Sequence, residues 1–221
     1  MLADLRDALA AHRLAQQIRR DRLTYLTHER LASLRRAAHD VGTVPGAVVE
    51  CGVALGGSGI WLASLLKDRE YHGYDVFDQI PPPGPQDPAK AHERYAVIAS
   101  GKSKGLGEDT YYGYLGDLLD RVSASFASYN LTPHLHKGLF EDSLHPEWPI
   151  ALAHIDCDWY EPVSVCLQRI TPWLACGARV IIDDYFDYGG SQKAVDEHLA
   201  GNPGFSRLRN AGHLVLGYTT R

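Results

Sequence analysis

No apolar run in this sequence is long enough to cross a membrane. A membrane-spanning helix needs roughly 20 consecutive apolar residues, and charged side chains interrupt every apolar stretch of this chain before that length. The opening stretch MLADLRDALAAHRLAQQIRRDR carries charges throughout, unlike the apolar core of a signal peptide. We therefore expect no membrane partner and a cytoplasmic location.

Positive charge is in the minority, and cysteine is scarce. The chain has 22 Lys and Arg against 27 Asp and Glu, a formal net charge of −5 at pH 7. This balance argues against nucleic acid as a partner. The four cysteines, Cys51, Cys157, Cys166 and Cys176, lack the C-x-x-C spacing of zinc and redox sites. We expect free thiols, mostly buried, and no disulfide framework.

Three familiar motifs are missing from the glycine-rich stretch VVECGVALGGSG. Ala54 occupies the place of the second glycine in the dinucleotide-binding pattern G-x-G-x-x-G. No G-K-S/T follows, so the stretch is not a phosphate-binding loop. GGSGI also lacks the G-x-S-x-G spacing of a hydrolase nucleophile, which makes Ser58 a residue at a helix start.

What the sequence does contain is a regular alternation of strand and helix patterns. Strands are predicted in VPGAVVECGV, at residues 71–76, 134–137, 150–156 and 179–183, and in FSRLRN and HLVLGYTT. Helices are predicted at residues 2–20 and 29–39, in GSGIWLASLLKDR, and at residues 118–129, 163–173 and 191–200. This order indicates one α/β domain over residues 1–221, with a mostly parallel seven-stranded sheet covered by helices on both faces. Residues 1–40 form a helical N-terminal arm.

Residues 77–116 interrupt the alternation. This segment is rich in proline, glycine and tyrosine, and it is too long for an ordinary connection. Segments of this kind usually cover a binding site, so we predict a lid. Its tyrosines Tyr111, Tyr112 and Tyr114 either stack on a sugar ring or pack the base of the lid itself.

Ligands of such sheets bind beyond the carboxyl ends of the strands. At the first such end, Gly52 and Gly56 permit close backbone approach, and Glu50 would repel phosphates but suit an ammonium or sulfonium group. The next strand ends in Asp75, where a carboxylate accepts hydrogen bonds from ribose hydroxyls. S-adenosylmethionine combines a ribose with a cationic amino acid end, so it is the predicted cofactor.

Two acidic segments, HIDCDWYEP and VIIDDYFD, bring carboxylates to the ends of two further strands. Burying them without partners is costly, and the oxygen-only set Asp156, Asp183 and Asp184 suits Mg²⁺. Proton transfer from an aliphatic hydroxyl, pKa about 16, to a carboxylate, pKa about 4, climbs about 16 kcal/mol. A metal ion would lower that barrier. Alternatively, Asp158 is an N-cap of the next helix, and His154 is structural.

Five segments together resemble the macrocin O-methyltransferase family of metal-dependent sugar methyltransferases with class I, Rossmann-like architecture. They are ECGVALGG, YDVF, KGLFEDSL, HIDCDWYEP and IIDDYFDYGGSQKAVDE. The resemblance implies that Asp156, Asp183 and Asp184 hold the metal and that Asp158 is the general base. It also implies cofactor contacts near LTHERL and in GLFEDSL. The candidate cofactor contacts are Leu26, Thr27, Glu50, Gly52, Gly56, Ser58, Asp75, Phe140, Asp142 and Asp156.

The predicted activity is S-adenosylmethionine- and Mg²⁺-dependent methylation of a sugar hydroxyl, on a glycosylated natural product or a small saccharide. We expect a homo-oligomer. A catechol-type methyltransferase needs the same metal but an apolar slot for its acceptor. Polar residues of the lid favour a sugar over an aromatic diol: Gln79, Asp87, His92 and Glu108. A non-catalytic cofactor-binding module is the third alternative, and it gives no reason to keep four acids together.

Overall fold

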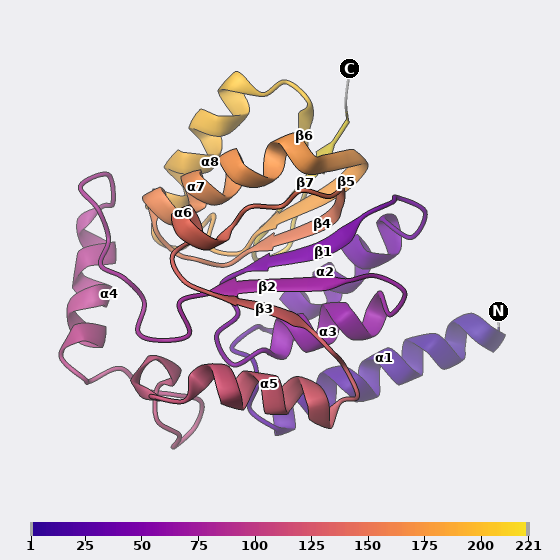
Figure 1. The fold of residues 1–221 in the computed structure, drawn as a ribbon, viewed down its shortest axis with the longest axis horizontal. Helices are drawn as coiled ribbons and strands as arrows, with labels where there is room; N and C mark the ends of the chain where they lie inside the picture. Colours follow the sequence, from indigo (N-terminus) through magenta and orange to yellow (C-terminus); the bar gives the residue numbers. More distant parts are fainter. Residues whose placement is uncertain (1, 220–221) are drawn as a thin grey trace.

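The structure is a computed structural model that describes residues 2–219, with side chains described from residue 6 onward (Figure 1). Its helices are α1 (Leu2–Arg20), α2 (His28–Asp40), α3 (Gly57–Leu65), α4 (Ala89–Ala99), α5 (Leu118–Ser128), α6 (Phe140–Ser143), α7 (Tyr160–Ile170) and α8 (Gly190–Gly201), with 3-10 turns η1 (Tyr112–Tyr114) and η2 (Thr171–Trp173). Its strands are β1 (Ala47–Cys51), β2 (Tyr71–Asp75), β3 (His134–Lys137), β4 (Ile150–Ile155), β5 (Leu174–Ile182), β6 (Phe205–Asn210) and β7 (Leu214–Tyr218).

The seven strands form one sheet in the order β3-β2-β1-β4-β5-β7-β6. Strands β1 to β5 run parallel, and β7 runs antiparallel between β5 and β6. The predicted mostly parallel, seven-stranded sheet is therefore confirmed. The strand order reverses between β1 and β4, which is the point where open α/β sheets bind their ligands.

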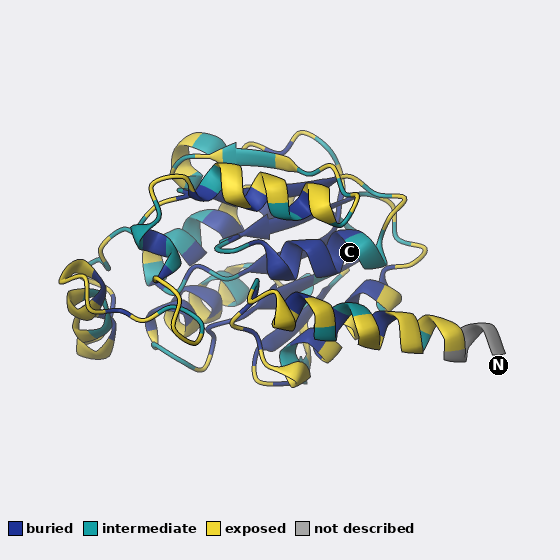
Figure 2. Ribbon diagram, turned by 90° about the horizontal axis from the view of Figure 1, so that it is seen from below, coloured by how far each residue is buried: buried dark blue, intermediate teal, exposed yellow. Residues whose placement is uncertain are grey.

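Neighbouring residues of a strand face opposite sides of the sheet, and each side carries its own helices (Figure 1). Val48 belongs to the apolar cluster that includes α1, α2, α3 and α5. Val49 belongs to the cluster that includes α7 and α8. Strands β1, β2 and β4 are buried along their whole length, as expected for parallel strands covered on both faces. Figure 2 shows this buried centre between more exposed helices.

The N-terminal arm is helical, as predicted. Helix α1 buries Ala11, Ala15 and Ile18, which recur at helical spacing, against the body of the protein. Over residues 6–20 the rest of its surface is largely exposed, and the helix extends beyond the sheet (Figure 2). Within the described part of the chain, no helix is long and apolar enough to cross a membrane.

Two of the differences from the predicted elements bear on the site. Helix α7 begins at Tyr160 because the side chain of Asp87 accepts a hydrogen bond from the Tyr160 N–H at 2.8 Å. Asp87 therefore supplies from a distant segment the cap that the local sequence lacks. Helix α4 was missing from the prediction altogether, because its helix-forming residues stand next to a proline-rich stretch.

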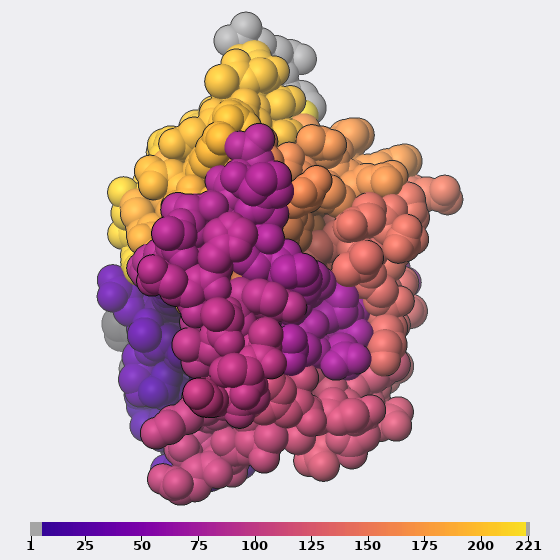
Figure 3. All heavy atoms as spheres, turned by 90° about the vertical axis from the view of Figure 1, so that its left-hand side faces the viewer, coloured from indigo at the N-terminus to yellow at the C-terminus, as the bar shows by residue number. Residues whose placement is uncertain are grey.

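Residues 77–116 cross the carboxyl-end face of the sheet, where Figure 3 shows them spread over the centre of the molecule. The hydroxyl of Tyr114 donates to the carbonyl of Ile98 at 2.6 Å and accepts from the Ser103 N–H at 3.1 Å. Tyr114 thus fixes the end of α4 to η1, whereas Tyr111 and Tyr112 line the cavity described below.

Candidate active site

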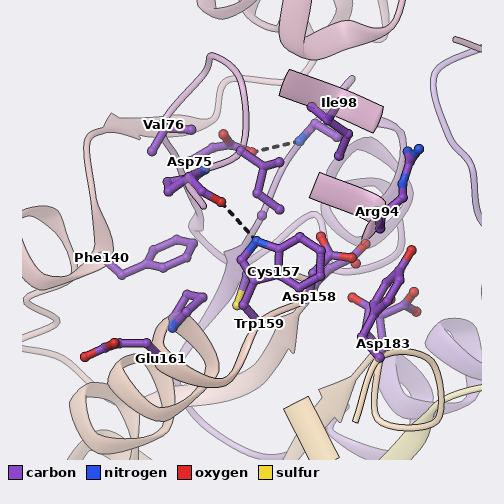
Figure 4. A pocket seen from close by; sticks show the side chains of 18 of the residues that line it. Asp75, Val76, Arg94, Ile98, Phe140, Cys157, Asp158, Trp159, Glu161 and Asp183 are labelled. Atoms are coloured by element: carbon purple, nitrogen blue, oxygen red, sulfur yellow. Dashed lines mark hydrogen bonds between the residues drawn. The ribbon is translucent and has the colours of Figure 1, made fainter. Parts of the chain in front are cut away.

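A cavity of about 500 Å³ opens at the carboxyl ends of β1, β2, β4 and β5 (Figure 4). Figure 4 shows Asp75 and Phe140 at one side of this cavity and Arg94, Asp158 and Asp183 at the other. Of the predicted site residues, eight line it: Leu26, Gly52, Asp75, Phe140, Asp156, Asp158, Asp183 and Asp184. The structure therefore brings the acidic segments and part of the cofactor set into one site.

Gly52 allows the ends of β1 and β4 to meet. Its backbone has φ 92°, and a Cβ atom built there would lie 1.8 Å from the carbonyl oxygen of Asp156. Its N–H donates to the carbonyl of Tyr74 at 2.8 Å. Any side chain at position 52 would push the acidic segment away from the glycine turn.

Asp75 holds the glycine turn in place. One carboxylate oxygen accepts from the N–H groups of Val53 and Ala54 at 2.7 and 3.0 Å, and the other accepts from Phe77 at 2.8 Å. Burial raises the pKa of Asp75, and the three backbone hydrogen bonds oppose that rise. Each oxygen of a carboxylate can accept more than one bond, so Asp75 can still receive hydroxyl donors from the cavity that it lines.

Glu50 does not line the cavity. Its side chain is fully buried, with one oxygen bound to the hydroxyl of Tyr71 and the other 2.8 Å from Nδ1 of His154. The carboxylate that we expected beside the cofactor's ammonium group lies beneath the turn. In this position it can act on a ligand through the shape of the turn, not through direct contact.

Four other predicted cofactor residues lie outside the cavity lining. Thr27 is exposed, and its hydroxyl caps α2 by accepting from the Arg30 N–H at 3.2 Å. Gly56 and Ser58 are packed at the start of α3, as a residue at a helix start would be. Asp142 is exposed on α6, whereas Phe140 from the same turn faces the cavity.

Asp183 is the most strongly bound member of the acidic cluster. Arg30 of α2 forms an ion pair with one of its oxygens. The other oxygen lies 3.1 Å from Nδ1 of His213 and 3.7 Å from Nε2 of His154. Although burial alone would raise it, these three partners hold the pKa of Asp183 well below its usual range. Asp183 is therefore an oriented, ionised carboxylate.

Asp156 and Asp184 lie among other carboxylates, in an environment opposite in charge to that of Asp183. Burial and the neighbouring carboxylates raise the pKa of both groups well above the usual range. One oxygen of Asp184 is buried and has no hydrogen-bond partner among the described residues. Like charges held together without counter-ions are costly. A divalent cation with oxygen ligands would relieve this repulsion, so the residues present fit Mg²⁺.

His154 is close enough to be considered as a further ligand. Donor atoms of His154, Asp156 and Asp183 lie within 4.8 Å of one another. Although burial alone would lower it, the nearby Asp183 and a hydrogen bond to Glu50 raise the pKa of His154 to about 9. Its Nδ1 lies 2.8 Å from Glu50 and its Nε2 lies 3.7 Å from Asp183. In this position the ring contacts both carboxylates, as a structural residue would.

Asp158 has a strained position at the entrance of α7. Its φ is 60°, in the left-handed region that few side chains adopt. Asp87 makes the side-chain hydrogen bond at the start of α7, and the N-cap position falls on Trp159, so the alternative of Asp158 as a helix cap is wrong. Burial and the charge of Asp183 raise the pKa of Asp158 to about 7, opposed by Arg94.

The segment 77–116 provides a mostly apolar wall of the cavity. Ile80, Pro81 and Pro82 lie on this wall, and Nε1–H of Trp159 donates to the Pro81 carbonyl at 3.0 Å. Among the described residues, the polar side chains that we expected here do not line the cavity: Gln79, Asp87, His92 and Glu108. These four residues make the lid polar, but they do not form the surface that faces the cavity.

Two arginines that line the cavity were not predicted from the sequence. Arg30 stands three residues after Thr27 in LTHERL, but its partner Asp183 is 153 positions away. Arg94 belongs to α4, which was not predicted, and its guanidinium lies 5.9 Å from the ring centre of Tyr111. Only their positive charge beside a cluster of acids could have pointed to them.

A glycine turn, a buried acid after the second strand and an acidic cluster across the same cavity define the class I methyltransferase architecture. The chain belongs to the macrocin-O-methyltransferase family, whose model matches residues 13–203. Membership confirms the resemblance seen in the sequence and makes the protein an O-methyltransferase.

Two curated relatives and two solved structures illustrate the similarity. Demethyldecarbamoylnovobiocin O-methyltransferase of Streptomyces niveus is 30% identical over 195 residues, covering 80% of this chain and 68% of the relative. A tetracenomycin-C 4'-O-methyltransferase of Streptomyces olivaceus, named for its 2,3-dimethoxy-rhamnosyl substrate, is 31% identical over 185 residues, covering 79% and 63%. The chain thus spans about two thirds of these relatives.

Among solved structures, the O-methyltransferase NovP has a TM-score of 0.74 and 26% identity, covering 90% of this chain and 83% of that one. A calicheamicin methyltransferase has a TM-score of 0.64 and 20% identity, covering 97% and 93%. At 20% identity, the similarity to the calicheamicin methyltransferase is one of fold alone.

Proposed function

We propose that the protein uses S-adenosylmethionine and Mg²⁺ to methylate a sugar hydroxyl, on a glycosylated natural product or on a small saccharide precursor of a methylated polysaccharide. The observation that carries the proposal is the pairing in one cavity of the Asp75 turn with four clustered carboxylates. The name of the Streptomyces olivaceus relative, which includes a rhamnosyl group, supports the sugar acceptor.

In this proposal Asp156, Asp183 and Asp184 would hold the cation. When bound, the ion would lower the pKa of the acceptor hydroxyl and orient its oxygen. Arg30, His154 and His213 keep Asp183 ionised and fix its direction. Partners of this kind usually matter because they set the orientation of the ligand atoms.

Asp158 would accept the proton of the acceptor hydroxyl. It lines the cavity beside the three metal-holding acids, and the helix that follows does not use its carboxylate as a cap. A pKa raised to about 7 makes this carboxylate a stronger base than an exposed aspartate. Methyl transfer itself is then mainly a matter of positioning the two reactants.

The cofactor would occupy the side of the cavity formed by Leu26, Gly52, Asp75 and Phe140. The backbone of Asp156 lies against Gly52 and its carboxylate belongs to the acidic cluster, so Asp156 would border both ligands. The remaining predicted contacts would shape the cofactor side from outside the lining: Thr27, Glu50, Gly56, Ser58 and Asp142. We also propose that residues 77–116 act as a lid and that the enzyme is a cytoplasmic homo-oligomer. Size-exclusion chromatography with light scattering would test the oligomeric state.

The apolar wall formed by Ile80, Pro81 and Pro82 gives specific support to a second candidate, a catechol-type acceptor. A panel of deoxysugar glycosides, free saccharides and catechols, assayed with S-adenosylmethionine and Mg²⁺, separates the two. Methylation of sugars alone supports the proposal. Methylation of catechols alone would replace it, and cofactor binding without methylation of any acceptor would favour a binding module.

A further inference from the structure

Three histidines lie together on β2 and β3, away from the acidic cluster. His72 and His134 are direct neighbours across the two parallel strands, and His136 follows two residues later on the same face of β3. The rings of His72 and His134 are stacked with centroids 4.6 Å apart. Strand β3 is the edge of the sheet, so this cluster borders solvent on one side.

His72 is the buried member of the cluster. Only 7% of the residue is exposed, and Trp148 covers it at 4.1 Å between ring centroids. Its Nδ1 lies 3.2 Å from Nε2 of His136, within hydrogen-bond distance. Its Nε2 is buried and has no hydrogen-bond partner among the described residues. A buried polar atom left unpaired costs about 1–3 kcal/mol, so this nitrogen is a feature that calls for a ligand.

Glu70 approaches the same nitrogen from the loop before β2. A carboxylate oxygen of Glu70 lies 3.6 Å from Nε2 of His72. Donor atoms of Glu70, His72 and His134 all lie within 4.8 Å of one another. Ligands about 2.0 Å from a tetrahedral zinc ion are about 3.3 Å apart, so the spacing of Glu70 and His72 is already close to that value.

For these three residues to bind one ion, the ring of His134 would have to move farthest. Its ring is stacked on His72 with an angle of 16° between the planes, and two parallel rings cannot both point a nitrogen at one ion. Because His134 is exposed, its ring is free to rotate out of the stack toward Glu70. His72 needs no such movement, since its other nitrogen already has a hydrogen-bond partner in His136, and an outer partner of this kind orients a ligating histidine.

We propose that Glu70, His72 and His134 form a binding site for a divalent transition-metal ion of the zinc type, separate from the acidic cluster. Imidazole nitrogens select zinc, cobalt, nickel or copper, whereas an all-oxygen set selects magnesium. None of the three residues lines the described cavity. A bound ion would join the loop before β2 to the edge strand β3, so its expected effect is on the stability of this edge.

Titration of chelator-treated protein with Co²⁺, followed by visible absorption, tests the site. The background is Asp156→Asn, which weakens ion binding at the acidic cluster. We expect one equivalent of Co²⁺ with the intense bands of a four- or five-coordinate ion, displaced by Zn²⁺. The variant His134→Ala should lose these bands and bind zinc less tightly, by more than the roughly 10–100-fold typical of losing an outer hydrogen-bond partner.

His92→Ala is the matched control, because His92 is also exposed but lies in α4, and it should leave the bands unchanged. Circular dichroism establishes that each variant is folded. Any of three results would overturn the proposal. The bands could persist in His134→Ala, they could be absent from the Asp156→Asn protein, or the His134 and His92 variants could lose them equally.

Discussion

Arg30 and Asp183 connect the N-terminal arm to the end of β5 by an ion pair that is largely removed from solvent. The side chain of Arg30 is 19% exposed and that of Asp183 is 3% exposed. A second nitrogen of Arg30 lies 2.8 Å from Asp187 in the same loop. The arm is therefore part of the active site, because it positions one of the acids proposed to hold the metal.

Replacing Arg30 by Gln should destabilise the protein, because it leaves the buried Asp183 with its two histidine partners only. Breaking a buried ion pair costs about 3–5 kcal/mol, and we expect about 2–3 kcal/mol here because Arg30 is partly exposed. Urea denaturation measures the loss. Arg121→Gln is the control, since its pair with Asp117 is exposed and such pairs contribute little. Equal effects of both variants would refute the structural role of Arg30.

Replacing Asp75 by Ala should weaken binding of S-adenosylhomocysteine by about 1.5–3 kcal/mol, the value of a hydrogen bond to a charged group. The variant also removes the acceptor for three backbone N–H groups of the turn. Calorimetry gives the affinity, with NAD as a ligand that should not bind. Asp120→Ala should leave the affinity unchanged because Asp120 is exposed on α5 and outside the cavity lining. Unchanged affinity in Asp75→Ala would remove Asp75 from the cofactor site.

Asp158→Asn should lower kcat by about 10²–10⁴-fold, the usual range for a positioned general base. KM should change little, since proton acceptance matters only near the transition state. Asp184→Asn should differ, because it weakens charge in the proposed metal site and excess Mg²⁺ should restore part of its activity. Steady-state kinetics at two Mg²⁺ concentrations distinguishes them. Rescue of Asp158→Asn by metal would assign it to the ligands instead.

Asp40 gives a prediction for the dependence of stability on pH. Although burial alone would raise it, hydrogen bonds and charges from Arg209 and Arg179 lower the pKa of Asp40. The unfolded chain therefore binds this proton more readily, so the contribution is complete above about pH 4 and is lost as the pH falls further. Asp40→Asn should cost about 1 kcal/mol at pH 7 and much less at pH 3, by urea denaturation. A difference independent of pH would contradict this.

The sheet could be predicted because strand and helix patterns differ in period and in residue type. The acidic cluster could be predicted because carboxylates directly after two apolar strands must meet at the same edge of a parallel sheet. The direction in which the Glu50 side chain points could not be predicted, because a carboxylate at the end of a strand can face either the ligand or the interior. In the structure Glu50 shares the face of Val48, and Tyr71 and His154 satisfy it there.

Contacts between residues far apart in the chain could not be predicted from the sequence. Asp87 reaches the start of α7 across 73 positions, and no local pattern indicates that a segment of prolines and glycines supplies a helix cap. Helix α4 was hidden for a related reason, since the turn-forming residues around it outweighed its own helix-forming ones. The acidic cluster was therefore easier to predict than the rest of the cavity lining, because its four acids all line the cavity whereas five of the predicted cofactor contacts do not: Thr27, Glu50, Gly56, Ser58 and Asp142.

Chelation is the most direct test of the central claim that a divalent cation in the acidic cluster activates the acceptor. Methyl transfer to a sugar acceptor is measured before and after EDTA treatment and again after Mg²⁺ is returned, with calorimetry of S-adenosylhomocysteine in parallel. The account predicts that turnover disappears with EDTA and returns with Mg²⁺, while the affinity for the cofactor product stays nearly the same. Full turnover in the presence of the chelator would contradict it.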